Sequence, residues 1–213
     1  DTNSQWIKEQ ISSYNLEITK SVIVPDDEEA IKEEVLSSLS FDIVFISGGL
    51  GPTHDDITKQ ALSEALDCSL EIDKKYKKKL TNRFKNRFKD TASLEKTLDS
   101  QCLILKGFTS IDNSIGTALG LTGKFKNTRL FILPGVPKEL KYMFINTVFP
   151  NYFTSNKFLT IHTLKTTGIT ESKLFLLLKE DIQNNSMDYK FSFLPHLSGV
   201  NIRIKGKQKN LME

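Results

Sequence analysis

Two adjacent carboxylates, Asp55 and Asp56, are the first residues in this sequence whose type and position suggest chemistry. They follow residues 47–52, which read SGGLGP, and that stretch follows a short apolar run at residues 43–46. Behind them, residues 57–66 repeat apolar side chains with helical spacing. We therefore predict a buried strand, a glycine loop and a helix N-terminus, with both carboxylates in the first helical turn.

This predicted unit is suited to bind an anion. The first amides of a helix have no internal partner, the macrodipole is positive there, and glycines let a ligand approach the backbone. The loop is not closed by the Lys-Ser or Lys-Thr of a P-loop, and the GxGxxG of dinucleotide-binding folds is absent. The candidate binding residues of this unit are Gly48, Gly49, Gly51, Thr53 and Thr58.

The two carboxylates have two possible roles. Thr53 and Asp56 have the spacing of a capping box, in which side chains satisfy the first helical amides. Alternatively, Asp55 and Asp56 bind a divalent cation or N–H donors of a ligand, since a bare phosphate would be repelled by them. Both roles remain open at this point.

Four motifs, in order along the chain, resemble those of one family. They are DTNS at residues 1–4, GGLGPTHDDIT at residues 48–58, NSIGTALG at residues 113–120 and LPGVPKE at residues 133–139. Together they resemble the molybdopterin-binding fold, and within it the N-terminal region of CinA-type competence/damage-inducible proteins. Leu119 stands where the family has proline.

The resemblance implies an α/β fold with three layers and a mostly parallel sheet over residues 1–150. A small β-α-β-β module similar to a KH domain is expected over residues 158–213 and is read as incomplete. The family's first strand and its C-terminal deamidase domain are read as missing from this sequence. Within the first part, we expect residues 16–24 to form a strand because they are rich in β-branched side chains.

The resemblance also implies a metal-dependent nucleotide pyrophosphatase that acts on ADP-ribose or a related nucleotide diphosphate. The glycine-loop amides and helix N-termini would hold the diphosphate. Asp55 and Asp56 would bind Mg²⁺ or Co²⁺, with K⁺ as a further possible ion, and Glu139 would join them as a catalytic residue. The substrate-binding residues that the other motifs add are Asn3, Asn113, Gly116, Thr117 and Gly135.

Glu139 and Gly135 follow a second predicted strand, at residues 129–133. In a parallel sheet, the loops that follow strands lie at one edge, where ligands bind. We therefore expect the loops at Gly48 and Gly135 to converge.

Two other functions fit the resemblance. The first is a molybdopterin-binding module without hydrolytic activity, in which the loop amides hold the phosphate of the pterin. The second is a non-catalytic, competence-associated protein. Relatives associate through this domain, so a homodimer is expected.

The composition indicates a globular protein. Of 213 residues, 38% are apolar and 26% are charged, and no apolar run has transmembrane length. Cys68 and Cys102 form no CxxC motif, which favours a cytoplasmic protein with idle thiols.

One segment, residues 74–89, is strongly basic, with nine Lys or Arg residues and no acid. Tyr76, Leu80, Phe84 and Phe88 recur every fourth residue within it, which predicts a helix with one apolar face. Because the aromatic side chains are then packed, nucleic-acid binding is disfavoured. A solvated face, or a cationic rim that attracts an anionic substrate, is the preferred interpretation.

Overall fold

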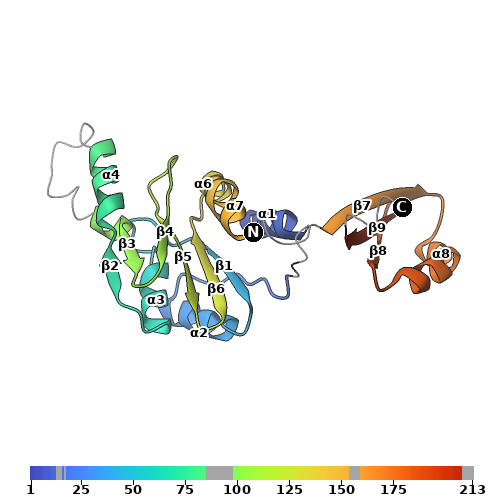
Figure 1. The fold of residues 1–213 in the computed structure, drawn as a ribbon, viewed down its shortest axis with the longest axis horizontal. Helices are drawn as coiled ribbons and strands as arrows, with labels where there is room; N and C mark the ends of the chain where they lie inside the picture. The colour runs from blue at the N-terminus through green and yellow to red at the C-terminus, as the bar shows by residue number, and fades with distance from the viewer. Residues whose placement is uncertain (13–15, 17, 85–97, 154–158, 208–213) are drawn as a thin grey trace. The chain divides into compact units, whose positions relative to one another are not determined.

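The computed structural model describes residues 1–12, 16, 18–84, 98–153 and 159–207. The chain divides into two compact units. The first combines residues 1–5 with 20–154, and the second combines residues 6–19 with 155–213. The first unit contains the larger sheet, and the second contains a small sheet, α8 (Glu171–Asn185) and residues 6–11 of α1 (Thr2–Ile11) (Figure 1).

A four-stranded sheet in the order β1-β6-β5-β4 forms the centre of the first unit. Its strands are β1 (Ile43–Ser47), β4 (Thr109–Ile111), β5 (Gly120–Phe125) and β6 (Thr128–Leu133). β1 runs parallel to β6, whereas β5 runs antiparallel to β6 and to β4. The predicted α/β class is confirmed, and the strand expected at residues 129–133 is present as β6.

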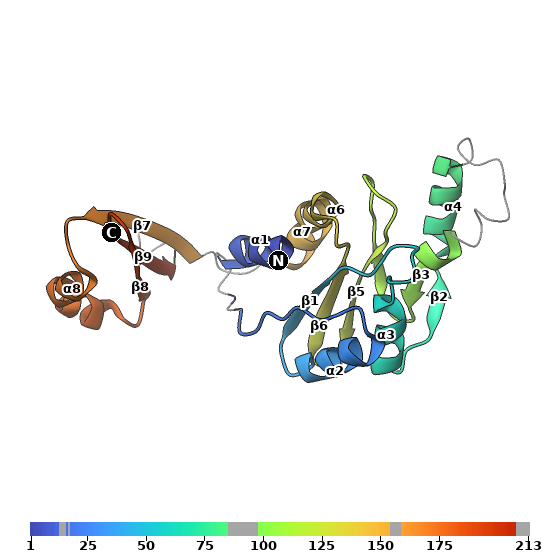
Figure 2. The same ribbon diagram turned by 180° about the vertical axis from the view of Figure 1, so that it is seen from behind.

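Helices cover both faces of this sheet (Figures 1 and 2). On one face lie α2 (Glu28–Ser38) and α3 (Thr58–Ala65), and on the other lie α6 (Pro137–Met143), a π-helical turn (Phe144–Val148) and α7 (Phe149–Tyr152). The remaining elements are α1 (Thr2–Ile11), α4 (Lys74–Phe84) and a two-stranded ribbon of β2 (Leu70–Ile72) and β3 (Leu103–Leu105). Within the described residues, no helix has the length and apolar character that crossing a bilayer requires.

β6 is buried on both faces because its alternate side chains serve two separate clusters. Leu130 and Ile132 are fully buried in the cluster that also contains Leu62 of α3. Phe131 points the other way, and its ring stacks on Phe45 of β1 at a centroid distance of 5.0 Å. Such a continuous apolar run is typical of a central strand between two helical layers.

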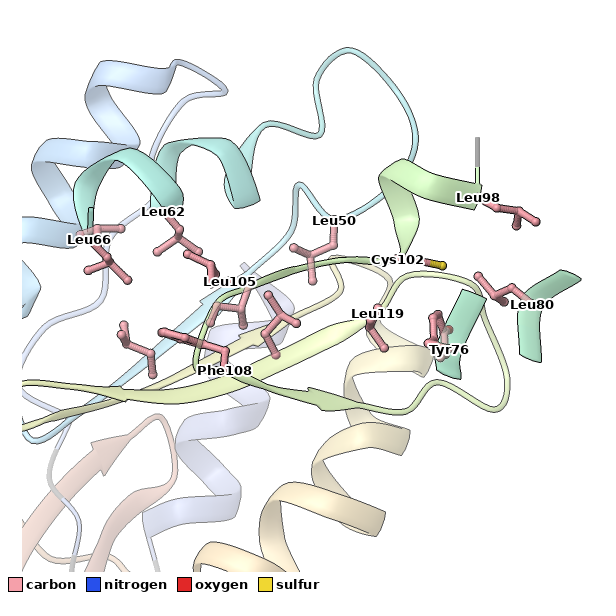
Figure 3. Close-up of a cluster of buried hydrophobic side chains, with 14 residues drawn as sticks. Leu50, Leu62, Leu66, Tyr76, Leu80, Leu98, Cys102, Leu105, Phe108 and Leu119 are labelled. Carbon is pink, nitrogen blue, oxygen red and sulfur yellow. The ribbon is translucent and has the colours of Figure 1, made fainter. Parts of the chain in front are cut away.

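The larger cluster fills the space between α3 and the sheet (Figure 3). Leu62 of α3 and Leu66 at the C-cap of this helix point toward the strands, and Leu119 is fully buried in the same cluster. Tyr76 and Leu80 extend it to α4, which confirms the apolar face predicted for the basic segment. The rest of that segment, including Phe88, lies outside the described residues.

Two local predictions were wrong. Residues 18–24 form no strand, and Val22 and Ile23 are 44% and 80% exposed. β-branched side chains favour a strand only where a neighbouring strand and a buried face are available. The helix after the glycine loop begins at Thr58, so Asp55 and Asp56 precede it instead of lying in its first turn.

The small sheet of the second unit has the order β7-β9-β8 and is antiparallel throughout. Its strands are β7 (Leu159–Thr167), β8 (Tyr189–His196) and β9 (Gly199–Lys207). Thr170 caps α8 by accepting a hydrogen bond from the amide of Lys173, and Leu174 packs with Val200 and Ile202. The elements follow the order β-α-β-β, and their likeness to a KH module stays a prediction.

We predict that Leu62→Ala destabilises the first unit by about 2–5 kcal/mol, because it leaves a cavity in a fully buried position. The matched control is Leu36→Ala in α2, where the side chain is 52% exposed. Urea unfolding of both variants measures the difference. Equal losses in the two variants would contradict the packing described for α3.

Candidate functional site

Two glycine turns meet at one edge of the larger sheet. β1 and β6 are parallel neighbours, with Ser47 opposite Leu133, so the turns that follow them leave the sheet side by side. The amide of Gly48 donates to the carbonyl of Leu133 at 3.0 Å. A Cβ atom added to Gly135 would lie 3.3 Å from the Cα of Gly48. The two backbones therefore touch at a point where side chains would keep them apart.

Asn3 connects the two turns. Its Nδ2 donates to the carbonyl of Gly135 at 2.8 Å and to Ser47 Oγ at 3.3 Å. The residue is 6% exposed, and its buried Oδ1 has no hydrogen-bond partner within the described part of the chain. An unpaired buried acceptor is costly, so this oxygen is suited to receive a donor from a ligand.

The first turn depends on glycine conformations. Gly48 and Gly49 have φ values of 110° and 64°, in the region that side chains disfavour. Thr58 holds this turn, because its amide donates to the carbonyl of Gly49 and its Oγ1 donates to that of Gly48. Among the residues the structure describes, none accepts a hydrogen bond from the amides of Gly49 and Leu50. These amides are the donors the turn can offer.

Asp56 is held by its own loop. Its carboxylate accepts hydrogen bonds from the amide of Thr53 at 2.9 Å and from Thr53 Oγ1 at 2.5 Å. Partial burial opposes its ionisation, but the hydrogen bonds from Thr53 and the Gly51 backbone outweigh this and lower the pKa of Asp56. The pairing of Thr53 with Asp56 thus exists, in a turn before the helix. Asp55 is exposed.

Glu139 lies at a different loop. Asn113 is 1% exposed and donates from Nδ2 to the Glu139 carboxylate, while its Oδ1 accepts from the amide of Gly116 at 2.8 Å. A Cβ atom on Gly116 would lie 2.1 Å from Glu139 Oε2, so a larger residue there would displace this carboxylate from its present position. Asn113 and Gly116 therefore position Glu139, and the Gly116 amide is engaged within the loop.

The three acidic residues of the expected metal site do not gather. Within the described ranges, no group of three or more His, Cys, Asp or Glu side chains could hold a metal ion. Asp56 is engaged by Thr53, and Glu139 is engaged by Asn113. This arrangement does not fit a site that holds Mg²⁺ or Co²⁺ through these carboxylates.

The basic helix α4 contacts the loop that carries Glu139's partners. Tyr76 donates its hydroxyl hydrogen to the carbonyl of Thr117 at 3.2 Å, and Arg83 donates from Nη1 to the carbonyl of Gly116 at 2.7 Å. Lys79 forms an ion pair with Asp112. These contacts were not anticipated from the sequence, because they join segments more than 30 residues apart.

Lys59 is a second residue that the sequence patterns did not single out. It lies on the inward side of α3, three residues before Leu62, and is 3% exposed. Its Nζ donates to the carbonyl of Gln101 at 3.1 Å. Burial lowers the pKa of Lys59 to about 8, although the nearby Cys102 and Asp56 act in the opposite direction. Burial raises the pKa of the Cys102 thiol to about 11.

A groove of about 380 Å³ lies away from this edge, between residues 22–25 and α2. Its lining includes Ala30, Glu33, Glu34 and Ser37. Glu34 forms an ion pair with Lys20. None of the predicted site residues lines this groove, so we place the candidate site at the glycine turns.

Comparison with known proteins identifies the family to which residues 1–153 belong. A family described as a probable molybdopterin binding domain matches residues 1–153, which is more than half of the chain. The chain belongs to this family. The predicted molybdopterin-binding-like fold is thereby confirmed.

CinA-like proteins match this chain over nearly all its length. A CinA-like protein of Amoebophilus asiaticus is 35% identical over 210 residues, covering 96% of this chain and 50% of that protein. Protein PYRAB15930 of Pyrococcus abyssi is 30% identical over 223 residues and is covered to 86% of its length. The chain spans about half the length of the CinA-like relatives that it matches.

A solved structure agrees with these relatives. The crystal structure of the protein CinA with unknown function from Thermoplasma acidophilum has a TM-score of 0.61 and 27% sequence identity. The match covers 68% of this chain and 83% of that one. The predicted resemblance to the CinA-type N-terminal region is confirmed by these findings. The roles assigned to individual site residues stay predictions.

We predict that Gly49→Ala destabilises the chain more than Gly107→Ala does. Both glycines have positive φ, but only the added methyl group at position 49 would collide with Thr58 Oγ1, at 2.1 Å. At position 107 there is nothing within 4 Å of the added Cβ. Both variants carry the strain of a positive φ, so the difference between their thermal unfolding midpoints measures the collision alone. Equal midpoints would contradict the described contact between Gly49 and Thr58.

We predict that the buried amine of Lys59 makes stability rise with pH above about 8. The lowered pKa means that the folded chain binds fewer protons at this position than the unfolded chain, so rising pH favours folding. Between about pH 8 and pH 9, the stability of the unaltered chain should rise by roughly 1 kcal/mol relative to Lys59→Met. Denaturant unfolding at several pH values measures this, and parallel profiles for the two chains would show that Lys59 is not buried as an amine.

Proposed function

We propose that this chain binds a phosphorylated small molecule of the pterin or nucleotide type where the two glycine turns meet. The contact between Gly48 and Gly135 carries this proposal, because it brings the main chains of the two glycine turns together at the sheet edge. The description of the family names molybdopterin, and the phosphate of such a ligand is the group that backbone donors recognise.

Each part of the turn has a role in this binding. The amides of Gly49 and Leu50 would donate to phosphate oxygens, and Gly135 keeps the opposite side free of side chains. Asn3 Oδ1 would accept a hydrogen bond from an N–H group of the pterin or base. Asp56, ionised at neutral pH, keeps the turn closed through Thr53 and is not itself a phosphate ligand.

Hydrolysis of ADP-ribose or a related nucleotide diphosphate is the second candidate. The exposed carboxylate of Asp55 beside the turn favours it. Against it, Asp56 and Glu139 are held by their own loops, and the described residues bring no three acids together. Binding without turnover is therefore the function that this geometry supports best.

We predict that Gly135→Ala weakens phosphate-ester binding about tenfold, because the added methyl group intrudes where the turns touch. Val136→Ala, at a neighbouring side chain that is 53% exposed, is the control. Isothermal titration calorimetry with molybdopterin and with ADP-ribose measures the affinities. Unchanged affinity in Gly135→Ala would place the ligand elsewhere.

The same samples separate binding from hydrolysis. Chromatography of ADP-ribose incubated with the chain and Mg²⁺ or Co²⁺ would reveal AMP and ribose 5-phosphate if the chain is a pyrophosphatase. Turnover that disappears in Asp55→Asn and Asp56→Asn would favour the second candidate over the first. Light scattering on the unaltered chain tests the expected homodimer.

A further inference from the structure

α4 does more than cover the core, because one side of it is fixed to the loop at residues 112–117. Tyr76, Lys79 and Arg83 are spaced three and four residues apart, so they share one face of the helix. Their side chains reach Thr117, Asp112 and Gly116 respectively. The helix and the loop are thus joined at three successive points.

Arg83 differs from Lys79 in how its charge is balanced. Lys79 pairs with the carboxylate of Asp112, which also accepts a hydrogen bond from Ser114. Arg83 hydrogen-bonds a carbonyl oxygen and lies 6.0 Å from the ring centroid of Phe84, and no carboxylate of the described residues lies within ion-pair distance of it. A carbonyl orients a guanidinium without neutralising it, and the exposed group keeps further N–H donors.

The position of Arg83 relates it to the glycine turns. The carbonyl it binds belongs to Gly116, whose Cα lies against the carboxylate of Glu139. Glu139 lies in the first turn of α6, which follows Gly135. Glu139 is thus connected through the chain to Gly135 and through its contact with Gly116 to Arg83.

We propose that Arg83 forms a second anion subsite, which binds a further phosphate group on the ligand held by the glycine turns. The planar fork of a guanidinium matches two phosphate oxygens, and α4 itself contains no acid that would compete. Glu139, which contacts Gly116 and follows Gly135 in the first turn of α6, would accept a hydrogen bond from a hydroxyl group of the ligand. The subsite rests on the proposed function and selects ligands with two phosphates over those with one.

The test compares adenosine 5′-monophosphate with adenosine 3′,5′-bisphosphate by calorimetry. The unaltered chain should bind the bisphosphate about tenfold or more tightly than the monophosphate, as a charge-assisted pair of hydrogen bonds supplies. Arg83→Gln should lose this preference while keeping its affinity for the monophosphate, and Arg83→Lys should restore part of it. Lys78→Gln is the control, since Lys78 points about 140° away from Arg83 around the helix.

The outcomes are distinguishable. If Arg83→Gln keeps the preference, or weakens both nucleotides equally, the subsite is overturned and the proposed function stands. If the unaltered chain binds neither nucleotide, the subsite is overturned, and the titration with molybdopterin decides the proposed function. An equal loss of preference in Lys78→Gln would show a diffuse charge effect of the helix and would also overturn the subsite.

Discussion

The parallel pairing of β1 with β6 is the constraint on which the candidate site depends. It places the carboxyl ends of two strands side by side, and the turns that follow must then share very little space. The sequence meets this demand with Gly48 on one turn and Gly135 on the other, and Asn3 joins the two with its amide group. Thr58 holds the first of these turns through its hydroxyl group, and Glu139 lies in the helix that follows the second turn.

Much of this edge could be predicted from local patterns. Glycines after an apolar run predicted the turn at Gly48. The recurrence of Tyr76 and Leu80 at every fourth residue predicted the apolar face of α4. These predictions succeeded because each depends on residues a few positions apart in the chain.

The features that local patterns did not reveal depend on residues that are far away in the sequence. The β-branched residues 18–24 do not form a strand, since a strand needs a neighbour that no local pattern reveals. Asp55 and Asp56 were expected to bind a metal ion, with Glu139 as a catalytic residue, and these roles stay predictions; the contacts of Asp56 with Thr53 and of Glu139 with Asn113 are what the structure adds. The buried position of Lys59 was not predicted for the same reason. Its neighbours Gln101 and Cys102 lie more than 40 residues away in the sequence.

The meeting of Gly48 and Gly135 has one more consequence. In the proposed site main-chain amides would hold the phosphate, so a substitution at either glycine could remove this binding but could not adjust it. If this proposal holds, a change in ligand preference would come from side chains around the turns, in α4 and in the loop that carries Asn113. Phosphate binding and ligand selection would then belong to separate parts of the molecule, and the second could vary while the first stays constant.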